Sequence, residues 1–258
     1  GVIQGIFRMH AQGSYNHVLR ARRQTLTVEG LCTLSRRCGD LYEAPGQETC
    51  QRFVEGNREL NVVSNFVQDG VAIGSLGSGE AVWHTDMSYN EIPPMASALY
   101  ALEVPPAGGE TGFSNMYMAY ESLPTSLKKR IKNLQCKHDA SRNSTGGLRR
   151  GMPANTTPRD APGAVHPILR THPVTGRKAL YLCERGQMDW FDGPFVGMVP
   201  CPYGDGARLL DALMAHYTRP EFLFVHEVTQ ADLLVVDQPC PLPPPTPNAH
   251  AERRRQAS

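Results

Sequence analysis

His84 and Asp86 are the residues whose types and spacing point most directly to chemistry. They form a His-x-Asp triplet, and side chains two apart in a strand share one face. An imidazole and a carboxylate on one face can bind a metal ion, and two histidines with one carboxylate make the facial site of Fe(II) oxygenases. A His–Asp hydrogen bond at a strand end explains the triplet alone equally well, because chance supplies one in roughly a third of such chains.

The segments around the triplet form a more specific pattern. The chain reads Trp-His-Thr-Asp at 83–86 and Gly-Gly-Glu-Thr at 108–111, followed by an aromatic and Leu-Pro segment at 113–124. Further matching segments occupy 165–181, 218–222 and 232–237. From about residue 18 to 237 the sequence resembles the taurine dioxygenase / 2,4-dichlorophenoxyacetate dioxygenase (TauD/TfdA) family. That family uses Fe(II) and 2-oxoglutarate.

The resemblance implies a fold and a set of roles. The fold is mainly β with helices, around a double-stranded β-helix core of the jelly-roll, cupin-like kind. His84 and Asp86 would be iron ligands, and the hydroxyl of Thr111 would hydrogen-bond the distal carboxylate of 2-oxoglutarate. Glu110 stands where the family usually has aspartate. Taken alone, Gly-Gly at 108–109 reads as an ordinary turn.

The C-terminal part departs from the family pattern W-D-N-R-x-x-x-H. The second metal histidine would fall at Pro243, which has no ligand atom, and prolines between 239 and 247 remove amide donors that a central strand needs. Arg254 keeps the spacing of the arginine that would bind the distal carboxylate, although a solvated basic tail explains it equally well. His250 is the alternative third metal ligand, and its use would require a remodelled strand.

Two main functions follow. The first is an Fe(II)- and 2-oxoglutarate-dependent dioxygenase that hydroxylates a small organic, anionic substrate and consumes molecular oxygen. The second is a degenerate, non-catalytic relative that binds small acids or a partner, with a local reading error near the C-terminus as a related explanation. A histidine-rich metal-binding jelly roll without 2-oxoglutarate is a third interpretation. Homo-oligomers are compatible with all three.

Hydrophobic periodicity and turn residues predict the elements that position these residues. Helices are expected at 27–37, at 115–134 with an interruption at Pro124, and at 206–217. Strands are expected at 60–67, 81–89, 97–104, 178–183, 221–228 and 233–236. Residues 141–163 read as a long loop of the kind that forms lids. Strands and helices do not alternate, which disfavours a doubly wound α/β fold.

Composition limits the remaining possibilities. With 258 residues and 40% hydrophobic content, we expect one dioxygenase-like domain over 1–258, short at its N-terminal side and atypical and proline-rich at 238–258. A net charge of +1 gives no basis for nucleic-acid or membrane binding. No apolar run suits a membrane helix, and no signal peptide is recognised. Seven widely spaced cysteines indicate free thiols in a reducing cytoplasm.

Overall fold

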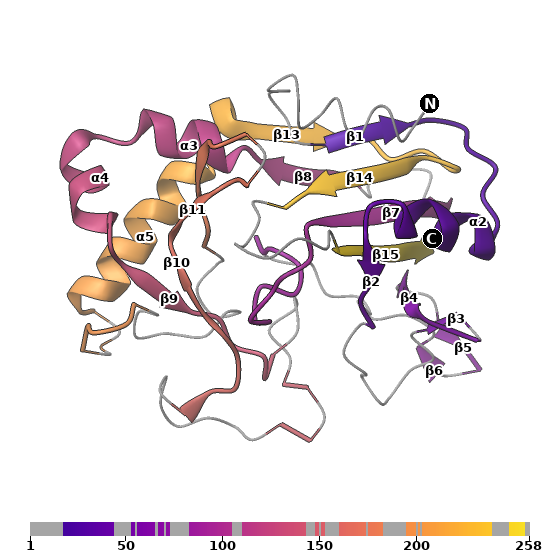
Figure 1. Cartoon of the computed structure of the whole chain (residues 1–258), viewed down its shortest axis with the longest axis horizontal. Coiled ribbons are helices and arrows are strands. Elements are labelled where there is room, and N and C mark those ends of the chain that lie inside the picture. Colours follow the sequence, from indigo (N-terminus) through magenta and orange to yellow (C-terminus); the bar gives the residue numbers. More distant parts are fainter. Residues whose placement is uncertain are drawn as a thin grey trace.

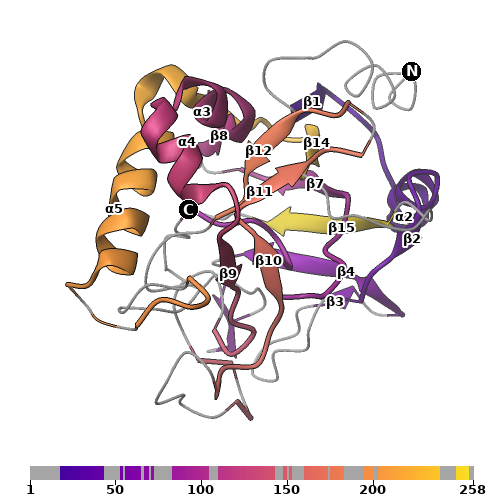
Figure 2. The same cartoon turned by 60° about the vertical axis from the view of Figure 1, so that its left-hand side comes forward.

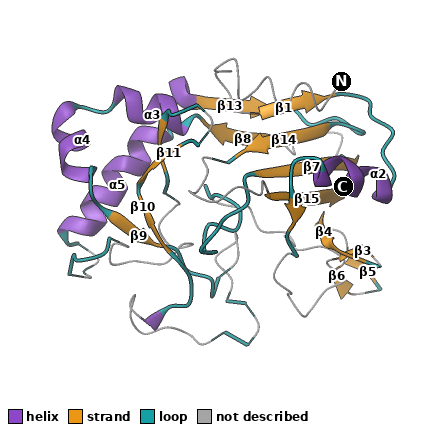
Figure 3. Ribbon diagram, in the orientation of Figure 1, coloured by secondary structure: helices purple, strands orange, loops and turns teal. Residues whose placement is uncertain are grey.

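The fold consists mainly of short strands, with helices at its two ends (Figure 3). The computed structural model describes residues 18–43, 53–54, 56–64, 67–69, 71–72, 83–104, 110–142, 148–149, 151–152, 160–173, 175–182, 195–199, 201, 203–238 and 248–255. Within these ranges, no helix has the length and apolar character that crossing a bilayer requires.

A seven-stranded sheet forms the centre of the molecule (Figure 1). Its strands run in the order β1 (Val18–Ala21), β14 (Leu233–Asp237), β7 (Ala96–Glu103), β15 (Asn248–Arg255), β4 (Asn57–Ser64) and β3 (Phe53–Val54), and β2 (Asp40–Leu41) also pairs with β15. β14 is antiparallel to both β1 and β7. β15 is parallel to both of its long neighbours, β7 and β4. The C-terminal strand therefore fills the middle of the sheet, as Figure 2 also shows.

Four antiparallel pairs surround this sheet. They are β8 (Thr111–Ser114) with β13 (Leu223–His226), β9 (Gln135–Lys137) with β10 (Val165–Pro167), β11 (Leu169–Thr171) with β12 (Lys178–Leu180), and β5 (Val67–Gln68) with β6 (Val71–Ala72). The first three pairs lie on the side of the sheet that faces α3, α4 and α5 (Figure 1).

The helices follow their capping and breaking residues. In α2 (Val28–Arg36), the Thr27 hydroxyl accepts a hydrogen bond from the Gly30 amide, which satisfies one free donor of the first turn. Pro124 separates α3 (Met116–Ser122) from α4 (Thr125–Ile131), because the residue before a proline is pushed into an extended conformation. α5 (Asp205–Tyr217) is followed by the 3₁₀ turn η2 (Pro220–Phe222). The three predicted helical regions are confirmed.

Two hydrophobic clusters hold the layers together. One lies between α2 and the large sheet and includes Leu31, Leu60 and Leu233, each at most 1% exposed. The other lies among α3, α5 and the β11–β12 pair and includes Leu180 and Leu213, which are fully buried. Burial of such a side chain contributes roughly 1.5–3 kcal/mol to stability. The two clusters therefore hold the helices against the strands.

The strand predicted over 81–89 is wrong in its described part. Residues 83–89 belong to no strand, and residues 86–89 form a turn in which the Asn90 amide donates to the Met87 carbonyl at 3.0 Å. Met87 has φ of 50°, in the left-handed region, where a strand cannot continue. Residues 81 and 82 lie outside the described residues. His84 and Asp86 are therefore brought together by a turn and not by strand alternation.

Most of the other predicted strands are confirmed, with shorter bounds. The strand expected at 97–104 is β7, that at 233–236 is β14, and that at 60–67 is β4 as far as Ser64. β12 covers the start of the segment predicted at 178–183, and β13 covers the middle of 221–228. The described parts of the loop predicted at 141–163 hold an isolated bridge between Arg142 and Leu148.

Candidate active site

The turn at 83–90 presents His84 and Asp86 at the surface of the molecule. The Nε2 atom of His84 lies 3.1 Å from Oδ1 of Asp86, and the two side chains are 30% and 24% exposed. Trp83 anchors the turn by packing on Gly112 of β8, where a Cβ atom would lie 3.1 Å from the indole ring. The triplet is thus accessible to a small molecule while its preceding residue is fixed against the β8–β13 pair.

The second oxygen of Asp86 is held from the large sheet. Ser97 Oγ, at the start of β7, donates to Asp86 Oδ2 at 2.8 Å, and Gln238 Nε2, just beyond β14, donates to the same oxygen at 3.2 Å. Gln238 also contacts Ser97 Oγ at 2.6 Å, and both residues are buried. Hydrogen bonds to one carboxylate oxygen fix the direction of the other, so Oδ1 points toward His84.

A buried contact between His172 and Asp237 supports the end of β14. Asp237 Oδ1 lies 3.4 Å from Nε2 of His172, which directly follows β11, and both side chains are at most 3% exposed. The backbone amide of Gln238 donates a hydrogen bond to the backbone carbonyl of Met95 at 3.1 Å. A buried polar side chain needs a polar neighbour, and this contact ties the end of β11 to Asp237, the residue before Gln238.

His84 and Asp86 have the geometry of two adjacent metal ligands. Two bonds of about 2.0–2.2 Å that meet at a right angle put their donor atoms about 3.0 Å apart, close to the observed 3.1 Å. The same distance fits a His–Asp hydrogen bond. Among the described residues, no group of three His, Cys, Asp or Glu side chains gathers for a metal. The side chains of β15, which include that of His250, lie outside the described part of the structure.

The other predicted site residues occupy defined places. Thr111 is the first residue of β8 and pairs with His226 of β13. The next residue, Gly112, contacts the ring of Trp83, so β8 lies beside the triplet. In β15, His250 is the register partner of Ser97, and Arg254 is the partner of Ala101. The backbone of Arg254 thus belongs to the central sheet and not to a solvated tail. Pro243 and residues 108–109 lie outside the described residues.

A second group of histidines is buried beside the turn. The His138 ring lies 5.3 Å from the rings of both His166 and Tyr181, and His166 Nε2 bonds the Asn90 carbonyl at 2.9 Å. Neither ring nitrogen of His138 has a hydrogen-bond partner among the described residues. Burial lowers the pKa of His138 to about 3, and the nearby Arg170 adds to this effect.

Two further histidines have lowered pKa values. Burial lowers the pKa of His166, and the positive charge of Arg170 acts in the same direction. Burial and Arg20 also lower the pKa of His226, although Asp232 lies 3.3 Å from its Nε2 atom and opposes the shift. His166, His172 and His226 are all buried, at most 4% exposed, which is typical of histidines with a structural role.

We expect the His138 ring to make the fold sensitive to acid. Its pKa is about 3 when folded and about 6.5 when unfolded, so the unfolded chain binds more protons below pH 6.5. The contribution of His138 to stability is therefore fully present well above pH 6.5, and it falls by about 1.4 kcal/mol per pH unit between pH 6 and 4. Urea unfolding at several pH values measures this slope.

His138→Phe is the matched variant for this measurement, because it keeps an aromatic ring and removes the titration. As the pH is lowered from 6 to 4, the free energy of unfolding of this variant should fall less steeply than that of the original chain. The difference between the two slopes should be about 1.4 kcal/mol per pH unit, the value for one proton. Equal slopes for the variant and the original chain between pH 6 and 4 would show that other groups cause the acid sensitivity.

Comparison with known proteins identifies the family. The family model described as "Taurine catabolism dioxygenase TauD, TfdA family" matches residues 15–240. The chain belongs to the TauD/TfdA family. The match ends before Pro243, His250 and Arg254, so the position expected for the second metal histidine lies beyond the matched residues.

Individual relatives agree with this assignment. Pentalenolactone F synthase of Streptomyces arenae is 32% identical over 193 residues, which are 70% of this chain and 62% of that protein. An alpha-ketoglutarate-dependent 2,4-dichlorophenoxyacetate dioxygenase of Burkholderia sp. (strain RASC) is 31% identical, over 71% of this chain and 61% of that protein. The chain thus spans about three fifths of the length of these curated relatives.

Solved structures confirm the predicted fold class. A taurine dioxygenase from Burkholderia xenovorans matches with a TM-score of 0.67 and 26% identity, covering 92% of this chain and 71% of that one. AAD-2, solved in complex with Mn(II) and N-oxalylglycine, matches with a TM-score of 0.69 and 27% identity, covering 92% of this chain and 79% of that one. The chain is a TauD/TfdA-type, cupin-like jelly roll with added helices.

Sequence reasoning missed the two residues that hold Asp86. Ser97 lies in an apolar strand and carries no local signal. Gln238 had a weak signal, because it follows Asp237 where the TauD/TfdA pattern W-D-N-R has asparagine, which is also an amide.

Proposed function

We propose that this chain is an Fe(II)- and 2-oxoglutarate-dependent dioxygenase. It would convert 2-oxoglutarate, oxygen and a substrate R–H into succinate, carbon dioxide and R–OH. The observation that carries this proposal is the His84–Asp86 pair, whose donor atoms lie 3.1 Å apart in the Trp-His-x-Asp motif of a TauD/TfdA family member. Two of the curated relatives are named as alpha-ketoglutarate-dependent dioxygenases, which favours the enzyme over the non-catalytic alternative.

In this proposal, His84 Nε2 and Asp86 Oδ1 hold the iron, and Ser97 and Gln238 position Asp86. When bound, Fe(II) supplies the open coordination positions and the redox chemistry by which oxygen is activated. The protein contributes ligand direction: with Oδ2 occupied by two hydrogen bonds, Asp86 presents a single oxygen toward the metal.

We propose His250 as the third ligand in place of Pro243. The register of β15 puts His250 beside Ser97, the residue whose hydroxyl bonds Asp86. From the sequence, this role for His250 was expected to require a remodelled strand. The pairing of β15 supports that expectation, because β15 is parallel to β7, whereas β14, the other strand paired with β7, is antiparallel to it.

We assign the distal carboxylate of 2-oxoglutarate to Thr111 and Arg254. Thr111 lies on the strand that Trp83 contacts, and a hydroxyl can donate to a carboxylate oxygen. Arg254 lies four residues beyond His250, or about 13 Å along a strand. A guanidinium binds a carboxylate through two parallel hydrogen bonds, which suits an anchoring role.

The substrate we propose is a small organic anion, in agreement with the phenoxy-acid names of two relatives. We further propose that residues 1–258 act as one domain, that the protein works in the cytoplasm, and that it forms homo-oligomers. The described cysteines Cys32, Cys38, Cys136 and Cys201 are free thiols, which suits a reducing compartment.

Anaerobic titration with Fe(II) and 2-oxoglutarate tests the proposal. A working site gives a weak visible metal-to-ligand charge-transfer band, and we expect this band from the unaltered chain. Its absence at saturating Fe(II) and 2-oxoglutarate would sink the oxygenase function for this chain.

The third ligand is tested by two variants. His250→Ala should reduce iron affinity by at least about tenfold, in the range that loss of a supporting group at a metal site causes. His226→Ala is the matched control, because this buried histidine bonds Asp232 and Arg20 and should leave iron affinity unchanged. If Pro243→His instead creates a band that the unaltered chain lacks, the degenerate interpretation holds and His250 is not the ligand.

A further inference from the structure

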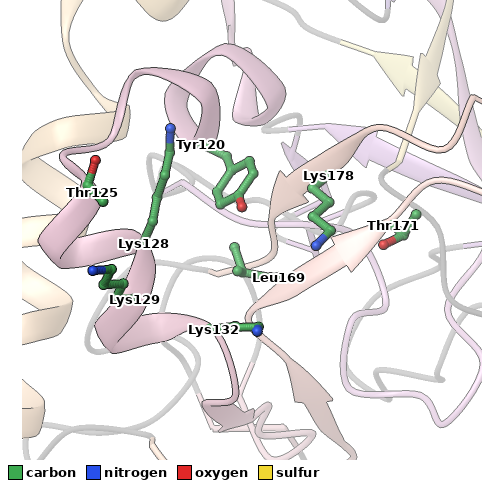
Figure 4. A pocket seen from close by; sticks show the side chains of 8 residues that line it. All are labelled: Tyr120, Thr125, Lys128, Lys129, Lys132, Leu169, Thr171 and Lys178. Atoms are coloured by element: carbon green, nitrogen blue, oxygen red, sulfur yellow. The ribbon is translucent and has the colours of Figure 1, made fainter.

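A cavity of about 310 Å³ lies between α4 and the β11–β12 pair (Figure 4). Its lining consists of Tyr120, Thr125, Lys128, Lys129, Lys132, Leu169, Thr171 and Lys178. Figure 4 shows the lysine-bearing helix on one side, the strands with Thr171 and Lys178 on the other, and Tyr120 and Leu169 between them. None of these residues belongs to the candidate active site.

The local fold dictates this grouping. Thr171 and Lys178 are register partners in the β11–β12 pair, so their side chains share a face, and Leu169 lies two residues from Thr171 on that same face. On α4, Lys128 and Lys129 lie in the last turn, and Lys132 follows it directly. Two unrelated segments thus bring positive charge to one hollow.

The cavity has a strong positive charge that the protein does not neutralise. Four lysines line it and no aspartate or glutamate does, although the whole chain carries a net charge of only +1. Lys128 Nζ donates to the Glu121 carbonyl at 2.6 Å. Within the described part of the chain, Lys129, Lys132 and Lys178 make no ion pair, and the carboxylate of Glu121 pairs with Arg177 at 2.7 Å.

We propose that this cavity binds a small organic phosphate. Lysine ammonium groups act as point charges that suit phosphate, whereas bidentate carboxylate recognition uses arginine, which is absent from the lining. The hydroxyls of Thr125, Thr171 and Tyr120 supply further donors to phosphate oxygens. The ring of Tyr120 and the side chain of Leu169 form an apolar floor for the carbon part of the ligand, and the volume is at the lower limit for ligand sites.

Calorimetry on the full chain with phenyl phosphate tests this site. Ionic strength is held constant, and saturating 2-oxoglutarate is present to occupy the proposed active site. We expect one saturable site per chain, with tighter binding of phenyl phosphate than of inorganic phosphate because of the apolar floor. The double variant Lys132→Gln/Lys178→Gln should weaken binding by at least about tenfold.

Arg130→Gln is the matched control, because Arg130 lies on the same helix, carries the same charge and does not line the cavity. It should change affinity by less than about twofold, since surface charges in salt solution are screened. An equal loss in this control would show diffuse charge attraction and overturn the proposal, as would the absence of saturable binding. Citrate bound as tightly as phenyl phosphate would overturn the phosphate assignment. Each outcome is independent of the proposed dioxygenase activity.

Discussion

Asp86→Asn is expected to abolish both the charge-transfer band and substrate hydroxylation, with turnover lowered by about 1,000-fold or more. The change keeps the size of the side chain and removes its negative charge. Ser97 and Gln238 both donate to Oδ2, so the amide oxygen will take that position to accept their hydrogen bonds. The amide nitrogen, which cannot ligate a metal ion, then replaces Oδ1 opposite His84. Anaerobic titration and succinate release measure the two losses.

A graded comparison separates ligation from positioning. Ser97→Ala removes one of the two donors to Oδ2 while Asp86 keeps its charge, so iron affinity or activity should fall by only about 10- to 100-fold. Asp205→Asn is the control for loss of one carboxylate, because Asp205 pairs with Arg208 at the exposed start of α5. A normal band in Asp86→Asn would exclude Asp86 as a ligand, and an equal loss in Asp205→Asn would point to general destabilisation.

Local sequence patterns predicted the elements whose causes are local. The cap at Thr27, the break at Pro124 and the apolar stripe of α5 each act within one or two turns, and all three helical regions were correct. The apolar run of β7 likewise predicted a buried strand at nearly its observed bounds. The family motif supplied the fold class, because its glycines, prolines and aromatic residues are spread over most of the chain.

The site itself depends on contacts that no local pattern contains. Gln238 reaches Asp86 across 152 positions of sequence, and Ser97 reaches Gln238 across 141. The sequence predicted a strand at the triplet, but the left-handed conformation of Met87 turns the chain there. The place of His250 beside Ser97 could not be predicted either, because it depends on β15 lying between β7 and β4.

Gly163→Ala is expected to destabilise the fold by about 3–5 kcal/mol, a large share of the stability of an ordinary domain. Gly163 has φ of 128°, which residues with a Cβ atom rarely adopt, and an added Cβ would lie 1.9 Å from the carbonyl oxygen of His138. Neither backbone can move aside easily. The two segments are hydrogen-bonded on both sides of Gly163: the His138 amide donates to the Ala164 carbonyl and the Ala140 amide donates to the Pro162 carbonyl, each at 2.8 Å. Urea unfolding at pH 7.5, above the pH range in which His138 makes stability depend on pH, measures the loss.

Gly176→Ala is the matched control for this clash. Gly176 also has a positive φ, 69°, but nothing lies within 4 Å of the position that its Cβ would take. Its replacement should therefore cost only the strain of the left-handed conformation, about 1–2 kcal/mol. Similar losses in the two variants would mean that segment 138–140 gives way to the new methyl group. A clear excess in Gly163→Ala would show that the backbone pairing beside His138 is rigid, and this pairing also sets the turn next to Asp86, because the Ala164 amide bonds the Tyr89 carbonyl at 2.9 Å.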